Sequence, residues 1–141
     1  MGAATVFFPA PMLHPDQVTK KGIVKVLIVE DDVNVARALS IRMKSAGYDT
    51  TIANDALSGV RSALTDPPDA VVLDISLPAG GGFLVAERIN AHLSVPMPII
   101  FLTASKRCDF RQKAYNLGAV AFFEKPYEAE GLLAAVRHAT A

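Results

Sequence analysis

Four apolar runs of this chain are followed or ended by polar residues whose side chains suit metal and phosphoryl chemistry. Glu30 and Asp31 follow the first run, and Asp74 ends the second. Thr103 follows the third run, and Lys125 comes shortly after the last. Carboxylate oxygens are ligands that a divalent cation prefers, and a hydroxyl and an ammonium group can bind phosphoryl oxygens. A fold that brings these five side chains together would have a site for a cation and a phosphate.

The apolar runs are short and lie between segments with helical spacing, a pattern typical of buried parallel strands. The predicted strands span residues 24–29, 48–53, 70–73, 99–102 and 120–123. The predicted helices span residues 33–46, 56–64, 83–93, 106–117 and 128–139, and a glycine-rich loop covers residues 77–82. The carboxyl ends of the strands line the ligand crevice of an open α/β sheet, so we expect the polar side chains to gather there.

The composition is that of one globular domain. The chain has 141 residues, of which 51% are hydrophobic and 20% charged, and a chain of this length can bury a sizeable core. Its 14 basic residues balance its 14 acidic residues, so nothing favours binding to nucleic acid or to an anionic membrane. No apolar stretch approaches the roughly 20 residues of a membrane span. The single Cys108 has no cysteine partner for a disulfide or a zinc site.

Residues 1–22 differ from the rest of the chain. Pro9, Pro11 and Pro15 interrupt this segment, which lacks both a periodic pattern and the basic start of a signal peptide. We therefore expect an irregular N-terminal extension over residues 1–22 and a single domain over residues 23–141.

Several short motifs follow one another along the predicted strand ends. They are Val29-Glu30-Asp31-Asp32, Leu73-Asp74-Ile75-Ser76-Leu77-Pro78 with Gly82 eight residues past Asp74, Leu102-Thr103-Ala104, Gly118-Ala119 and Phe122-Phe123-Glu124-Lys125-Pro126. With these motifs, over about residues 25 to 139, the chain resembles the receiver domain of bacterial two-component response regulators. The resemblance implies a doubly wound (βα)5, flavodoxin-like three-layer sandwich whose five parallel strands have the order 2-1-3-4-5.

The resemblance implies roles for the acidic residues. Asp74 would be the phosphorylation site, and Mg²⁺ would be bound directly by Asp31 and Asp74. Glu30 would bind the ion through water, and Ser76 through its backbone carbonyl. Two carboxylates about 5 Å apart repel each other by about 3 kcal/mol at an effective dielectric constant of about 20, so crowded acids favour a dication. For Asp32, the last acid of the first motif, a solvated charge is the better interpretation, together with a role in capping the following helix.

The resemblance also gives roles to two polar residues and to an aromatic residue. Lys125 would pair with the acids and then with the phosphoryl group, which Thr103 would bind through its hydroxyl. In the family, the position of Phe122 holds an aromatic ring that moves inward when the threonine shifts toward phosphate. From composition alone Phe122 is a core residue, so a switch role and a core role both remain open. The loop 79–82 departs from the family by its run of glycines, which predicts mobility near Asp74 and leaves the choice of partner open.

These assignments predict a signalling switch more than an enzyme. Asp74 would accept a phosphoryl group from a sensor histidine kinase or a histidine phosphotransfer protein, in phosphorelay signal transduction. The face built by the helix over 106–117, the strand over 120–123 and the last helix would then change, and a downstream protein partner or output domain would bind there. We expect a cytoplasmic protein that is a monomer or a weak homodimer, with no direct contact to nucleic acid or membrane.

Three other functions fit the sequence less well. A magnesium-dependent phosphotransferase of the haloacid dehalogenase-like group needs a second acid two residues after its nucleophile, where this chain has Ser76. A dinucleotide-binding domain needs a G-x-G-x-x-G motif after the first strand, where Glu30 and Asp31 would repel a pyrophosphate. A receiver-like scaffold that is never phosphorylated would not need the complete set of acids together with Thr103 and Lys125.

Overall fold

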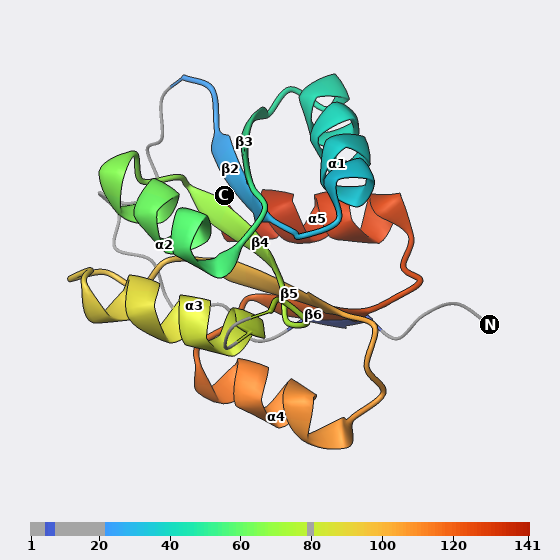
Figure 1. The fold of residues 1–141 in the computed structure, drawn as a ribbon. Coiled ribbons are helices and arrows are strands. Elements are labelled where there is room, and N and C mark those ends of the chain that lie inside the picture. The colour runs from blue at the N-terminus through green and yellow to red at the C-terminus, as the bar shows by residue number, and fades with distance from the viewer. Residues whose placement is uncertain (1–4, 8–21, 79–80) are drawn as a thin grey trace.

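A six-stranded sheet with helices on both faces forms the centre of the molecule (Figure 1), seen here in a computed structural model. The structure describes residues 5–7, 22–78 and 81–141. The elements, in chain order, are β1 (Thr5–Phe7), β2 (Lys25–Val29), α1 (Val33–Ser45), β3 (Asp49–Ala53), α2 (Ala56–Thr65), β4 (Ala70–Asp74), α3 (Gly81–Ala91), β5 (Ile99–Thr103), α4 (Cys108–Asn116), β6 (Ala121–Glu124) and α5 (Ala129–Ala139). In these ranges, no helix is both long enough and apolar enough to cross a membrane.

The strands lie in the order β1-β6-β5-β4-β2-β3, and the five strands from β2 to β6 are all parallel to their neighbours. When the five parallel strands are numbered 1 to 5 from β2 to β6, their order across the sheet is 2-1-3-4-5. This confirms the predicted flavodoxin-like fold. The register pairs Val29 with Leu73 and Asp74 with Leu102. The carboxyl ends of β2, β4 and β5 are therefore nearly level, so the polar residues that follow the strands lie in one row.

Alternate residues of each strand face opposite helical layers. Leu27 and Val29 of β2 lie in the core beneath α2, α3 and α4, whereas Val26 and Ile28 lie in the core beneath α1 and α5. All four side chains are buried. Burial on both faces explains why these strands are continuous apolar runs in the sequence rather than alternating ones.

One strand departs from the sequence-based expectation. Thr5–Phe7 forms β1, which pairs antiparallel with β6, placing Val6 opposite Phe122. The prediction of an irregular segment is thus wrong for residues 5–7, while residues 1–4 and 8–21 lie outside the described part of the chain. Three residues are too few to show a period, and their pairing partner is far away in the sequence, so only the tertiary structure brings the two segments together.

The helix α1 begins where the sequence predicted. The Asp32 side chain accepts hydrogen bonds from the backbone N–H groups of Asn34 and Val35, at 3.0 and 3.1 Å. These bonds satisfy two of the N–H groups that the first helical turn leaves without a partner, which confirms the predicted capping role. The cap fixes the chain directly after Glu30 and Asp31.

The helix α3 begins two residues earlier than predicted, at Gly81 within the glycine run. The N–H of Gly82 donates to the carbonyl of Ile75 at 2.9 Å, and a Cβ on Gly82 would lie 2.4 Å from the carbonyl oxygen of Asp74. Only glycine allows this approach, because a side chain would collide with the backbone. The first turn of α3 therefore packs directly against the end of β4.

Candidate functional site

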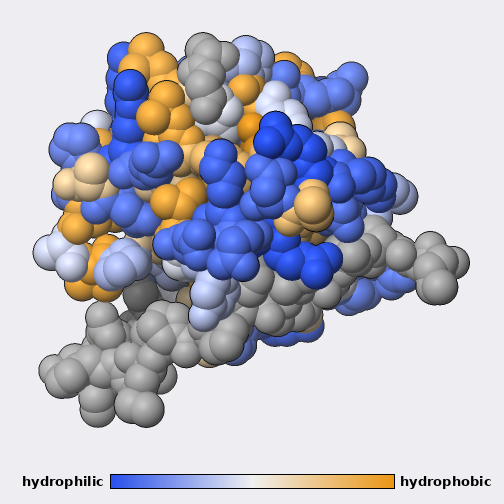
Figure 2. Space-filling model, turned by 90° about the horizontal axis from the view of Figure 1, so that it is seen from below, coloured by the Kyte–Doolittle hydropathy of each residue, from blue (hydrophilic) through white to orange (hydrophobic). Residues whose placement is uncertain are grey.

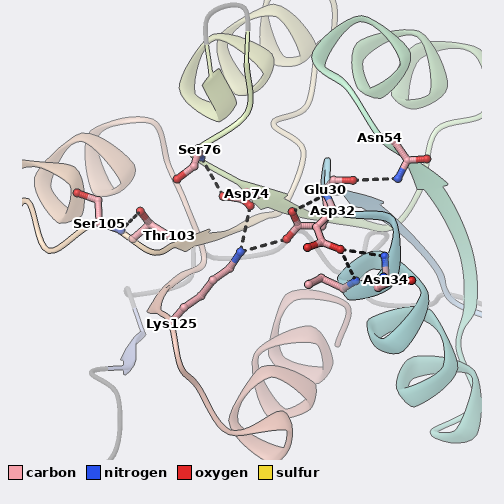
Figure 3. A network of polar contacts seen from close by, with 10 residues as sticks. Glu30, Asp32, Asn34, Asn54, Asp74, Ser76, Thr103, Ser105 and Lys125 are labelled. Atoms are coloured by element: carbon pink, nitrogen blue, oxygen red, sulfur yellow. Dashed lines mark hydrogen bonds and ion pairs between the residues drawn. The ribbon is translucent and has the colours of Figure 1, made fainter.

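The carboxyl ends of four parallel strands bring the predicted polar residues together (Figure 3). Asp74 is the last residue of β4, and Glu30 follows β2. Thr103 ends β5, and Lys125 follows β6. In Figure 3 the Lys125 side chain extends from its strand toward Asp74 and Glu30. The peptide bond between Lys125 and Pro126 is cis.

Lys125 bridges the two buried carboxylates. Its Nζ donates to Glu30 Oε1 and to Asp74 Oδ2, both at 3.1 Å. Glu30 and Asp74 are only 2% and 3% exposed, so neither charge is well solvated. A cation between two such groups offsets part of their mutual repulsion and of their desolvation cost.

The acidic residues also fit a cation site. One carboxylate oxygen from each of Glu30, Asp31 and Asp74 can be chosen so that all three lie within 4.8 Å of one another. Asp31 is exposed, while the other two are buried, so the cluster is open on one side to solvent. Oxygen ligands with room for water are the surroundings that Mg²⁺ prefers. The cluster is thus a candidate metal centre.

Ser76 lies beside this cluster. Its backbone N–H donates to Asp74 Oδ1 at 2.9 Å, which leaves the two Asp74 oxygens with different partners. This bond and the one from Lys125 hold the carboxylate in one orientation. The predicted contact from the Ser76 carbonyl to a metal ion stays a prediction.

Glu30 has an unusual acidity. Burial raises the pKa of its carboxyl group from 4.5 to about 7, and the nearby Asp74 carboxylate adds to the rise. The N–H of Asp32 and the ammonium group of Lys125 act in the opposite direction. Burial alone would lower the pKa of Lys125, but its hydrogen bonds to Asp74 and Glu30 and their charges outweigh burial and raise it. Lys125 is therefore a fixed cation, and Glu30 holds a proton readily.

Thr103 and Phe122 occupy the neighbouring strands β5 and β6. The Thr103 side chain is buried, and its Oγ1 accepts a hydrogen bond from the Ser105 N–H at 3.0 Å. The Thr103 carbonyl accepts from the Lys125 N–H at 2.7 Å, which links the ends of the two strands. Phe122 is 2% exposed and lies in the core with Phe101. Its ring is thus in an inward position, which agrees with a core role and leaves its switch role a prediction.

Two residues near the site were missed by the sequence analysis. Asn54 follows β3, and its side-chain amide donates to the Glu30 carbonyl at 3.0 Å. Its place directly after a predicted strand is the same signal that pointed to the other site residues. Tyr127 packs edge-on against Phe123, with ring centroids 5.8 Å apart, and burial raises the pKa of its hydroxyl. No local pattern marked Tyr127, because its position depends on how the chain turns after Pro126.

The order of the strands and the grouping of acids, threonine and lysine at their ends define a receiver-type domain. Residues 26–137 match the family of the response regulator receiver domain. The chain belongs to this family.

Individual relatives agree with this membership. The transcriptional regulatory protein DltR of Streptococcus agalactiae is 36% identical over 113 residues, which are 80% of this chain and 50% of that protein. The chain thus spans about half the length of this curated relative.

Solved structures are similar over nearly the whole of their length. The non-phosphorylated HemR receiver domain from Leptospira biflexa is 30% identical, with a TM-score of 0.76 over 84% of this chain and 94% of that chain. A CheY-like response regulator receiver domain protein from Methanospirillum hungatei is 25% identical, with a TM-score of 0.78 over 83% of this chain and 93% of that chain.

The acidity of Glu30 predicts a pH-dependent stability of the metal-free protein. Between about pH 4.5 and 7 the folded protein keeps the Glu30 proton that the unfolded chain has lost. The free energy of unfolding should therefore fall by roughly 2–3 kcal/mol as the pH rises through this window. Urea unfolding in EDTA at about pH 5, 6 and 7.5 measures this change. Glu30→Gln should remove it, and the exposed Glu128→Gln should not. Equal slopes for wild type and Glu30→Gln would contradict the assignment.

Proposed function

We propose that this chain is a phosphoacceptor switch that takes a phosphoryl group on Asp74 from a sensor histidine kinase or a histidine phosphotransfer protein. The observation that carries the proposal is the buried Asp74 carboxylate, held at 3.1 Å by Lys125 and grouped with Glu30 and Asp31. A carboxylate oriented by two donors and surrounded by cation-binding groups is prepared to attack phosphorus. The chain is a switch and not an enzyme, because the carboxylate that is phosphorylated belongs to the chain itself.

The transfer follows from the positions of these side chains. An oxygen of Asp74 forms a bond to phosphorus while the bond from phosphorus to the donor histidine nitrogen breaks, which leaves an acyl phosphate on Asp74 and a neutral histidine once that nitrogen has taken a proton. The ammonium group of Lys125 stabilises the negative charge on the phosphoryl oxygens. The Thr103 hydroxyl donates a hydrogen bond to one of these oxygens. Water later attacks the same phosphorus, the bond from phosphorus to the Asp74 oxygen breaks, and inorganic phosphate leaves, which restores the carboxylate.

Mg²⁺ is the cofactor of this proposal. Asp31 and Asp74 would bind it directly, Glu30 through water and Ser76 through its backbone carbonyl. When bound, the ion supplies positive charge against the phosphoryl oxygens. The carboxylates of these residues would orient the ion, and its positive charge would offset the repulsion among them.

The phosphoryl group would act at a distance through β5 and β6. Thr103 would shift toward a phosphoryl oxygen, and Phe122, on the neighbouring strand, would adjust its packing. The surface of α4, β6 and α5 then changes for a downstream protein partner or output domain, as a shift between two packings. We place this switch in the cytoplasm, as a monomer or weak homodimer without direct contact to nucleic acid.

Phosphorylation is expected at Asp74 alone. Incubation with acetyl phosphate and Mg²⁺ should add one phosphoryl group to the wild-type protein, and the intact mass measures it. Asp74→Asn should lose the modification, because an amide is not a nucleophile for phosphorus. The exposed Asp109→Asn should keep it and serves as the control. A wild-type yield on Asp74→Asn would refute the proposed role of this residue.

Magnesium is expected to stabilise the fold through Asp31. At ten to a hundred times its dissociation constant, the ion should add about 1–3 kcal/mol to the free energy of unfolding, seen as a rise of the melting temperature. Asp31→Asn should lose most of this rise. Asp32→Asn should keep it, because the neighbouring side chain caps α1 and an asparagine can also cap. If the two variants respond to Mg²⁺ alike, Asp31 is not a ligand.

Thr103 is expected to transmit the change without being needed for phosphorylation. Thr103→Ala should accept a phosphoryl group on Asp74, yet show weaker NMR shifts over residues 106–127 on addition of beryllofluoride and Mg²⁺. Without its hydroxyl, residue 103 cannot form the hydrogen bond that would move the end of β5 toward the phosphoryl group. Thr65→Ala, which removes a hydroxyl bonded only within α2, is the control. Equal shifts in wild type and Thr103→Ala would rule out the coupling.

A further inference from the structure

The β6 strand would be an edge of the parallel sheet if β1 did not cover it. Ala121, Phe122 and Phe123, the residues that pair with β1, are buried and apolar, and the one polar residue of β6 is Glu124 at its end. An edge of this kind presents a row of backbone N–H and C=O groups that pair readily with another strand. In this molecule the three residues of β1 take that place, in antiparallel register.

The opposite edge of the sheet is protected in a different way. The β3 strand has the sequence Asp49-Thr50-Thr51-Ile52-Ala53, and most of it is exposed. A charged and hydroxyl-rich strand is a poor template for association. The two edges thus differ in kind: β3 relies on its own side chains, and β6 relies on a separate segment of the chain.

The cover on β6 is small. It consists of three residue pairs, whereas each parallel pairing inside the sheet has four or five. Short pairings at an edge open with little free energy compared with core strands. The β1 strand is therefore the part of the sheet that another strand could most easily replace.

The covered edge lies within the face on which the proposed switch acts. The β6 strand runs between α4, on one side of the sheet, and α5 on the other (Figure 1), and Val6 of β1 pairs with Phe122. Figure 2 shows the side on which α4 lies as mostly hydrophilic, with smaller hydrophobic spots. The exposed Arg111 and Lys113 outnumber Asp109, the one acid of α4, which pairs with Arg107 just before the helix, so α4 carries a small positive net charge. A partner reaching β6 would therefore find backbone pairing groups beside a positively charged helix.

We propose that residues 5–7 are a displaceable ligand built into the chain, which closes the β6 edge against antiparallel pairing with β6 of a second copy. Pairing of two identical antiparallel strands is self-complementary and gives a closed dimer with twofold symmetry, so it needs no other surface. The proposal rests on the proposed function only for the role of this face in signalling. The closed edge itself is independent of phosphorylation.

The geometry of such a dimer gives it a recognisable salt dependence. A twofold axis perpendicular to the sheet keeps the helical layers of the two copies on the same sides, so α4 lies on the same side as α4 of the partner copy. The two positively charged helices repel each other, and salt screens this repulsion. Edge pairing should therefore strengthen with salt, whereas an association driven by opposite charges would weaken.

The test uses the full chain with Val6→Pro and Phe7→Pro together. Because alternate residues of an antiparallel strand make the ladder bonds, two adjacent prolines remove at least one N–H donor to β6. The control, Val6→Thr with Phe7→Thr, keeps both N–H groups and a strand-forming preference. Amide hydrogen exchange over residues 121–123 measures whether β1 stays paired with β6. Sedimentation equilibrium at low and high salt measures the dimerisation constant. A peptide of residues 1–9 is added in excess as a competitor.

We expect faster exchange over residues 121–123 and at least tenfold tighter dimerisation in the proline variant than in the wild type or the control. Added salt should tighten the dimer further, and the peptide should dissociate it. Unchanged exchange, an unchanged dimerisation constant, or a dimer that salt weakens would each overturn the proposal. If the proline variant does not fold by circular dichroism, Val6→Gly with Phe7→Gly takes its place under the same criteria. Phosphorylation of the same variants by acetyl phosphate is measured separately, so a failure of the proposed function is distinguished from a failure of the edge.

Discussion

The ion bridge from Lys125 to Glu30 and Asp74 is the contact on which the site depends. It joins the ends of β2, β4 and β6, and it places a cation at 3.1 Å from two carboxylates that are almost completely buried. Without that cation, the low dielectric constant would disfavour a second negative charge beside Asp74, and Glu30 would hold its proton more strongly. The same bridge raises the pKa of Lys125, so the positive charge is present throughout the physiological range.

The need to place these groups explains several features of the surrounding structure. Gly82 lets the first turn of α3 approach the backbone at Asp74, where any side chain would collide. Asp32 caps α1 and so fixes the chain directly after the acidic pair. Asn54 holds the Glu30 carbonyl from the end of the next strand. Each of these residues restricts the position of a carboxylate, so the acids are held close together although they repel one another.

The two edges of the sheet are protected in two different ways against pairing with a strand of another molecule. At β3, exposed polar side chains discourage pairing, and at β6 a short segment from the other end of the chain supplies the missing neighbour. Because β6 also leads into Lys125, the covered edge and the candidate site share a strand. Val6 of β1 pairs with Phe122, which lies three residues before Lys125 in the chain.

The sequence alone determined the elements and the site residues. Apolar runs, helical spacing and strand-end acids depend on local chemistry, so the five parallel strands, the cap at Asp32 and the gathering of Asp74, Glu30 and Lys125 could all be predicted. The early start of α3, the pairing of β1 with β6 and the place of Tyr127 could not. Each depends on contacts between segments that are distant in sequence or on a close approach of two backbones, and such contacts leave no periodic pattern. Only the tertiary structure decided them, because packing and backbone pairing form between distant segments as the chain folds.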